Sequence, residues 1–130
     1  RLLGTSTREI QADRLDAAGR LARNTEATVV LKGHRTLIAA PDGRLAVNSS
    51  GNPGMATAGP GDVLAGMIGA FLARGLSAWD ASRLAVYTHG TAGDLAVRRT
   101  GEDGMIAGDL VDEIPSALRA LSTLEENRPW

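Results

Sequence analysis

The sequence contains no cysteine, only two histidines and few aromatic residues. The absence of cysteine excludes a disulfide framework, a zinc site built on thiolates and a cysteine nucleophile. The two histidines, His34 and His89, leave little for a metal site built on imidazole ligands. Aromatic residues make up 3% of the chain, too few for the stacking platforms that bind single-stranded nucleic acids.

Charge and apolar runs exclude two further classes of partner, nucleic acids and membranes. The formal net charge is −1, so the sequence lacks the strong positive field that is typical of nucleic-acid binding. The longest apolar run, residues 63–73, is shorter than the ~20 residues that a membrane-spanning helix needs. The chain begins at Arg1 with neither Met nor the apolar segment of a signal peptide, so we expect it to be part of a longer protein.

Hydrophobic periodicity and turn residues predict a mixture of helices and strands. The expected elements are a helix over residues 8–23, strands over 27–31, 36–40 and 44–47, helices over 62–74 and 78–99, and two short helices between about 107 and 124 separated at Pro115. The helix 62–74 is expected to be buried nearly all round. Gly90 and Gly93 weaken the helix 78–99 unless another backbone packs close to them.

The strongest chemical signal is a glycine-rich loop, residues 48–61, which leads directly into the predicted helix 62–74. The first N–H groups of a helix have no internal partner, and the helix dipole adds partial positive charge there. Gly59 and Gly61 would let an anion approach the backbone, and with Pro60 they predict an anion hole for a phosphate. Asp62 stands beside that anion, where its expected work is to accept a proton from a hydroxyl that attacks the phosphate.

A simpler interpretation is that Asp62 is an ordinary N-terminal helix acid and that the glycines only shape a turn. Two familiar phosphate-binding motifs do not fit: Lys32 lacks the glycine context of a Walker A loop, and Leu64 stands where a dinucleotide fingerprint needs a third glycine. Lys32 is the single lysine among 14 basic residues. It follows the predicted strand 27–31, at the edge where α/β sheets place ligands.

The glycine loop belongs to a longer string that resembles the signature of the nucleotide-dependent NAD(P)H-hydrate dehydratases, a family of the ribokinase-like superfamily. The string is Gly-Asn-Pro-Gly-Met-Ala-Thr-Ala-Gly-Pro-Gly-Asp-Val-Leu, residues 51–64. The stretches 5–14, 30–36 and 87–96 agree in order and spacing. The resemblance implies that residues 1–130 are a single C-terminal portion of a three-layer α/β/α ribokinase-like domain, with a mostly parallel central sheet, a β-hairpin and flanking helices.

The activity that this resemblance implies is repair: the family removes water from hydrated NADH or NADPH, driven by ADP or ATP with Mg²⁺. Asp62 matches the family's base-like, substrate-contacting aspartate, and Gly61, with Gly59 beside it, belongs to the nucleotide-binding anion hole. The residues expected along the adenine nucleotide are Lys32, Gly33, His34, Arg35 and Thr36. No residue is expected to be a dedicated metal ligand. We further expect a cytoplasmic homo-oligomer, and relatives carry a fused NAD(P)H-hydrate epimerase domain.

Two other functions stay open on the sequence alone. A ribokinase-like kinase of a small molecule, such as a vitamin precursor or a sugar, would need the same anion hole and the same Asp62. A non-catalytic nucleotide-binding fragment is the other, because the family's N-terminal half lies outside these 130 residues. We expect His89 to be a hydrogen-bonded packing residue, and Asp94 and Asp109 to be helix caps or solvated acids.

Overall fold

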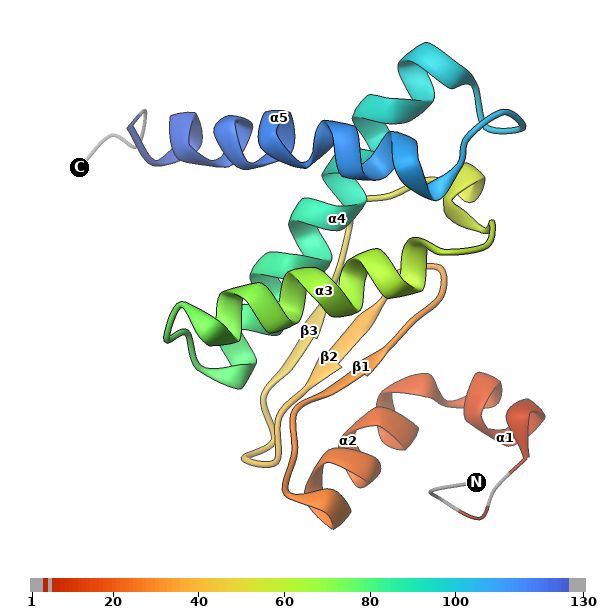
Figure 1. Cartoon of the computed structure of the whole chain (residues 1–130). Coiled ribbons are helices and arrows are strands. Elements are labelled where there is room, and N and C mark those ends of the chain that lie inside the picture. The colour runs from red at the N-terminus through yellow and green to blue at the C-terminus, as the bar shows by residue number, and fades with distance from the viewer. Residues whose placement is uncertain (1–3, 5, 127–130) are drawn as a thin grey trace.

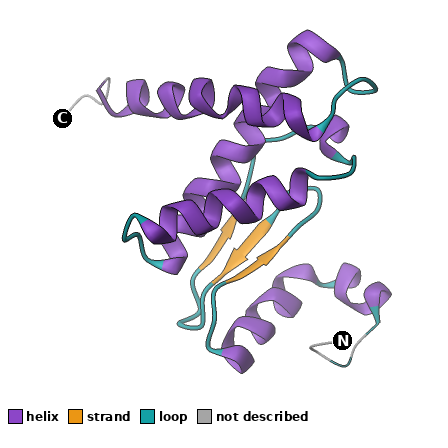
Figure 2. Cartoon of the chain, viewed as in Figure 1, coloured by secondary structure: helices purple, strands orange, loops and turns teal. Residues whose placement is uncertain are grey.

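The computed structural model describes residue 4 and residues 6–126, in which helices cover both faces of a small sheet (Figure 1). The elements in chain order are α1 (Thr7–Ala12), α2 (Arg14–Thr25), β1 (Val29–Leu31), β2 (Leu37–Ala39), β3 (Leu45–Val47), the 3₁₀-helix η1 (Pro53–Met55), α3 (Pro60–Ala73), α4 (Ala78–Thr100) and α5 (Ala107–Glu126). In Figure 2 the strands, drawn in orange, lie between α2 on one side and α3 with α4 on the other. The α/β character that the sequence predicts is confirmed.

The three strands of the sheet are antiparallel, in the order β1-β2-β3. Ile38 at the centre of β2 lies opposite Val30 of β1 and opposite Ala46 of β3. The expectation of a mostly parallel sheet is therefore wrong for the strands of this chain. Residues 32–36 and 40–44 connect the strands, and both segments are far shorter than the roughly dozen residues that a parallel crossover needs.

The core has two parts because the side chains of β2 point alternately to the two faces of the sheet. Leu37 and Ala39 pack with Ala18 and Ala22 of α2. Ile38 faces the larger cluster, which α3 and α4 build on the opposite side. The beginning of α3 and the middle of α4 are thereby held against the same face of the sheet.

The helix predicted over residues 8–23 is two helices that meet at Asp13. The backbone of Asp13 leaves helical geometry, with φ −142° and ψ 83°, and its carboxylate accepts the N–H of Asp16 to cap α2. At the other end of the chain the prediction errs in the opposite sense, because α5 runs through Pro115 without a break. Pro115 leaves the carbonyl of Val111 without its helical donor, and both residues are exposed, so water can satisfy that carbonyl.

The helix α3 is buried on one face only, which corrects the expectation that it is buried nearly all round. Its buried residues follow the spacing of a single helical stripe: Pro60, Leu64, Met67 and Phe71. On the other face Leu72 is 43% exposed. Among the described residues no helix is long and apolar enough to cross a membrane.

Candidate functional site

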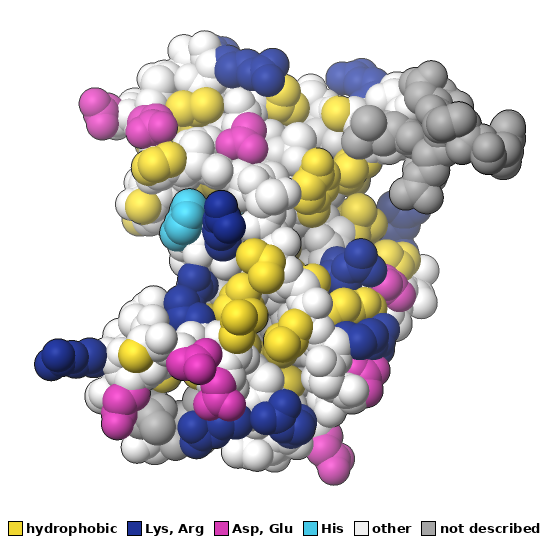
Figure 3. Space-filling model, turned by 180° about the vertical axis from the view of Figure 1, so that it is seen from behind, with side chains coloured by type: hydrophobic (Ala, Val, Ile, Leu, Met, Phe, Trp, Pro, Cys, Tyr) yellow, Lys and Arg dark blue, Asp and Glu magenta, His cyan; other side chains and the backbone are white. Residues whose placement is uncertain are grey.

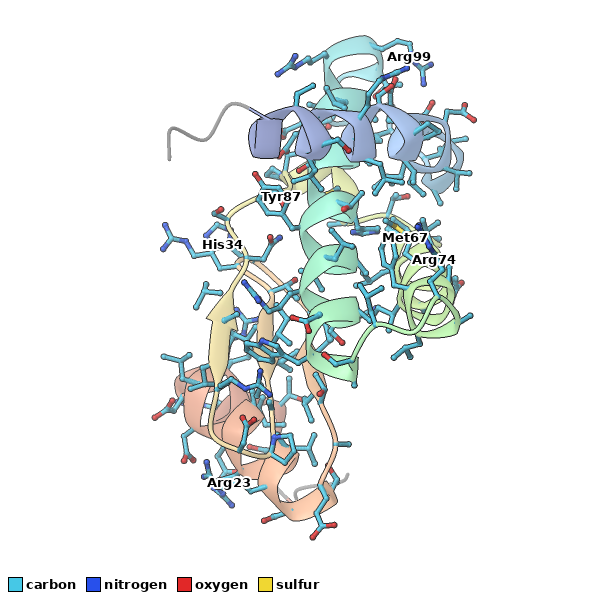
Figure 4. The ribbon with its side chains drawn as sticks, turned by 90° about the vertical axis from the view of Figure 1, so that its left-hand side faces the viewer. Arg23, His34, Met67, Arg74, Tyr87 and Arg99 are labelled. Atoms are coloured by element: carbon cyan, nitrogen blue, oxygen red, sulfur yellow. The ribbon has the colours of Figure 1, made fainter. Side chains whose placement is uncertain are left out.

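A cavity of about 560 Å³ lies where two loops meet the beginning of α3 and the middle of α4. One wall is the loop 32–36 that follows β1, and the other comes from residues of the loop 48–57. Seen from behind in Figure 3, the molecule has a notch between its upper helices and its lower layer, with Lys, Arg and His side chains at the rim. In Figure 4, His34 lies at the opposite end of the strands from Arg23. The cavity is thus at the end of the sheet opposite the turn 40–44, which joins β2 to β3.

The loop 32–36 contributes all five of its residues to the cavity lining: Lys32, Gly33, His34, Arg35 and Thr36. Its backbone is tightly bent, since φ is 139° at Gly33 and 54° at Arg35. The Thr36 hydroxyl closes the bend by donating to the Gly33 carbonyl at 3.2 Å. The bend places residues 32–36 along one wall of the cavity.

Arg14, which sequence reasoning did not single out, braces this loop from α2. Its guanidinium donates to the carbonyl of His34 at 2.6 Å, to that of Leu31 at 3.2 Å and to that of Lys32 at 3.3 Å. Three carbonyls converge on one planar group because guanidinium presents its donors in a fixed fork. No pattern along the chain distinguishes Arg14 from a solvated helix arginine, because its partners lie 17 to 20 residues away, at the end of β1 and in the loop after it.

Lys32 and Gly61 meet at the beginning of α3. Gly61 lines the cavity, and a Cβ built on it would overlap the Nζ of Lys32, so the ammonium lies directly against the first turn. The structure therefore brings the predicted loop and the predicted helix start together. An ammonium group and a helix N-terminus both favour a negative charge, so this corner of the cavity is suited to a phosphate.

The backbone donors at this corner are fewer than the run Gly59 to Asp62 suggests. Pro60 has no N–H, and the N–H of Asp62 donates to the Gly59 carbonyl at 2.9 Å. Within the described part of the chain, the N–H of Gly61 has no hydrogen-bond partner. Gly59 lies outside the lining and makes the turn into α3, with φ 97° and a Cβ position only 2.8 Å from the Cβ of Ala107. The phosphate corner of the cavity therefore consists of the Lys32 ammonium and the N–H of Gly61.

Asp62 is exposed in the first turn of α3 and does not line the cavity. Among the described residues its carboxylate has no hydrogen-bond or ion-pair partner, so it is free to engage a group that approaches from outside the cavity. It follows Gly61 directly in the chain, so a molecule that contacts Asp62 would also be near an anion held at Gly61. The structure thus separates the residues that line the cavity from the carboxylate at its edge.

His89 is buried in α4, where its Nε2 lies 2.8 Å from the carbonyl oxygen of Pro60. A carbonyl only accepts, so Nε2 carries the hydrogen. Burial lowers the pKa of His89 below its ordinary value; the hydrogen bond with the Pro60 carbonyl opposes this shift in part, and the nearby positive charge of Lys32 adds to it. The neutral imidazole therefore anchors the first turn of α3, which is the packing role that the sequence predicts.

The loop 48–57 rests on α4 at the two glycines that the sequence marks. A Cβ on Gly90 would come within 2.7 Å of the Ser50 carbonyl carbon, and one on Gly93 within 2.8 Å of the Met55 Cγ. The prediction that another backbone packs closely against this helix is confirmed at Gly90, whereas at Gly93 the contact is with the Met55 side chain. Asp94, expected as a cap or a solvated acid, instead accepts hydrogen bonds from the loop; Asp109 does act as a cap, since it accepts the N–H of Ile106.

The described residues offer no group of three or more His, Cys, Asp and Glu side chains that could hold a metal ion. Mg²⁺ commonly binds through substrate phosphates, water and one or two carboxylates, without a cage of protein ligands. The arrangement around Asp62 and the phosphate corner is compatible with that mode of binding.

Comparisons with known proteins identify similar sequences and similar folds. The profile of the NAD(P)H-hydrate dehydratase family, Carb_kinase, matches residues 1–116. The chain is 52% identical over 121 residues to a bifunctional NAD(P)H-hydrate repair enzyme, Nnr, from Moorella thermoacetica, covering 93% of this chain and 23% of that relative. The chain thus spans about a quarter of this curated relative's length.

Two solved structures share the fold. The ADP/ATP-dependent NAD(P)H-hydrate dehydratase from Bacillus subtilis, co-crystallised with ATP/Mg²⁺ and soaked with CoA, superposes with a TM-score of 0.87 at 33% identity, over 92% of this chain and 44% of that one. A ribokinase-like superfamily protein from Enterococcus faecalis gives a TM-score of 0.70 at 32% identity, over 85% of this chain and 38% of that one. The ribokinase-like fold class predicted from the sequence is confirmed.

Proposed function

The chain belongs to the NAD(P)H-hydrate dehydratase family, and from that premise we propose that it is the C-terminal portion of an enzyme that dehydrates hydrated NADH or NADPH with ADP or ATP as co-substrate. The observation that carries the proposal is the meeting of the Lys32 ammonium with the first turn of α3 inside a cavity. At about 560 Å³ the cavity falls within the roughly 300–1,000 Å³ that small-molecule sites occupy.

In this proposal the adenine nucleotide lies along the loop 32–36, and its terminal phosphates reach the corner formed by Lys32 and the N–H of Gly61. Arg14 keeps the loop in place through its carbonyls, and His89 keeps the first turn of α3 in place through Pro60. Gly59 supplies the left-handed turn into the helix. These residues bind and orient, and they carry no proton in the reaction.

The proposed chemistry places Asp62 at the hydroxyl of the hydrate. As that oxygen attacks the terminal phosphorus of the nucleotide, its proton passes to the Asp62 carboxylate, and the bond from phosphorus to the bridging oxygen breaks. The phosphorylated hydrate then loses inorganic phosphate and a ring proton, which forms the double bond of NADH or NADPH. Asp62 releases its proton to solvent, and the sum is hydrate plus ATP giving NAD(P)H, ADP, phosphate and a proton, with AMP in place of ADP when ADP is consumed.

Several wider properties belong to the same proposal. Mg²⁺ would be bound through the phosphates of the nucleotide and would neutralise part of their charge, and Asp62 is a carboxylate in the neighbouring first turn of α3. The complete protein would work in the cytoplasm as a homo-oligomer, and the bifunctional relative supports an additional NAD(P)H-hydrate epimerase domain elsewhere in the protein.

The direct test is to express the full open reading frame that contains this chain and to supply it with hydrated NADH, ADP or ATP, and Mg²⁺. Recovery of reduced-nicotinamide absorbance with release of phosphate is the expected result. A stable phosphorylated product without recovery of NADH would instead favour the small-molecule kinase. Nucleotide binding without any turnover would favour the non-catalytic alternative.

A further inference from the structure

We propose that Asp94 of α4 is a positioning residue, whose carboxylate holds the loop 48–57 in the shape that receives the adenine nucleotide. This inference rests on the proposed function, because it names a residue that sets affinity at the same cavity. Asp94 does not line the cavity itself. It acts through Gly51 and Asn52, which do line it.

The two oxygens of Asp94 each hold a different part of the loop. Oδ2 accepts the backbone N–H of Gly51 at 2.9 Å, and Oδ1 accepts the side-chain amide of Asn52 at 3.1 Å. The side-chain Oδ1 of Asn52 in turn accepts the N–H of Gly54 at 3.1 Å and so caps η1. A single carboxylate thereby fixes two adjacent residues of the cavity wall, Gly51 and Asn52, and through Asn52 it also orients Gly54.

The loop can approach Asp94 because α4 carries glycine, with no side chain, at the positions that the loop contacts. Gly90 and Gly93 allow Ser50 and Met55 to sit against the helix backbone. Gly51 has φ 101°, so the chain turns there through a conformation that side chains disfavour, and its N–H needs a fixed acceptor. The charged acceptor at Asp94 supplies it in a stronger bond than a neutral group would.

The chemistry of the three hydrogen bonds makes the residue types at 52 and 94 interdependent. Asp94 must accept twice, while Asn52 must donate once and accept once. In Asp94→Asn alone, an amide donor would face another donor. In Asn52→Asp alone, two carboxylates would face each other. The double exchange satisfies all three bonds, because the amide at 94 can accept from Gly51 and donate to the carboxylate at 52, which still accepts from Gly54.

The test is a double-mutant cycle in the full open reading frame, with the dissociation constant for ADP measured by calorimetry and the melting temperature measured in parallel. Each single variant, Asp94→Asn and Asn52→Asp, should bind ADP about ten-fold or more weakly, as the loss of a hydrogen bond to a charged group predicts. The double variant should return to within about three-fold of the wild type, since coupled residues are not additive.

Asp109→Asn is the matched control, because Asp109 also accepts a backbone N–H and a side-chain donor, those of Ile106 and Arg99, at a place outside the cavity lining. It should lower the melting temperature and leave ADP affinity unchanged. Single variants that bind ADP within two-fold of the wild type, or a double variant as weak as the singles, would overturn the positioning role. Wild-type protein that binds ADP but never converts the hydrate would overturn the proposed function alone, and wild-type protein that binds no ADP would overturn both.

Discussion

Replacing Gly61 by alanine would move one positive charge at the phosphate corner without removing any group. A Cβ at position 61 would occupy the space of the Lys32 ammonium, which is the free end of a flexible side chain and can swing away. Gly61 lies inside α3 and has no left-handed φ, so alanine fits the backbone. The fold should therefore be unharmed, and could gain up to about 1 kcal/mol in free energy of unfolding from better helix propensity.

The cost should appear in nucleotide affinity. If the ammonium moves from about 3 Å to about 5 Å from a phosphate oxygen, the attraction weakens by about 2 kcal/mol at an effective dielectric constant of about 20. That loss corresponds to roughly a 30- to 50-fold increase in the dissociation constant. A methyl group that also narrows the approach to the N–H of Gly61 would act in the same direction.

Calorimetric titration with ADP and a thermal melt of the same sample measure both quantities. Gly69→Ala is the matched control, because Gly69 lies in the same helix and a Cβ there would meet nothing within 4 Å. The control should raise or keep the melting temperature and leave ADP affinity unchanged. A Gly61→Ala variant that binds ADP within two-fold of the wild type would refute the assignment of the phosphate corner.

Three further outcomes follow from the same geometry. Lys32→Ala should weaken ADP binding by at least ten-fold, because the charge at the phosphate corner is removed, and an unchanged dissociation constant in the same titration would count against it. Arg14→Lys should lose about 1–3 kcal/mol of unfolding free energy and also weaken ADP binding, because an ammonium cannot donate to three carbonyls as the guanidinium fork does. Denaturant unfolding measures the first effect and titration with ADP measures the second. Burial lowers the pKa of His89 in the folded protein, so the unfolded chain binds more protons and the free energy of unfolding should fall as the pH drops below about 6.5. His89→Gln keeps a donor for the Pro60 carbonyl and removes this titration, so its melting temperature should change less than that of the wild type between about pH 7.5 and 5.

The local parts of the site could be predicted from the sequence because their signals are local. The glycine loop before α3 and Lys32 after β1 are each marked by composition and by the residues that flank them. The glycines at 90 and 93 indicate a close contact with another segment because they weaken the helix that contains them. The strand and hairpin positions follow from the same kind of short-range pattern.

What the sequence could not supply is tertiary pairing. Arg14 and Asp94 act through partners about 20 and 40 residues away, and an isolated arginine or aspartate on a helix looks the same whether it is solvated or bonded. The position of Asp62 outside the cavity depends on how α3 turns after Gly59. The break at Asp13 was missed because an Asp inside a helical pattern becomes visible as a cap only once the backbone turns there.

The Asp62→Asn variant of the full open reading frame tests the central claim most directly, with turnover of hydrated NADH and ADP affinity measured on the same preparation. The amide keeps the shape of the side chain and removes the base, so turnover should fall by about 10²–10⁴-fold. The phosphate corner persists and one negative charge beside it is lost, so ADP should bind as tightly as before or more tightly. Turnover within a few-fold of the wild type would contradict the catalytic assignment and leave Asp62 as an ordinary acid at the beginning of a helix.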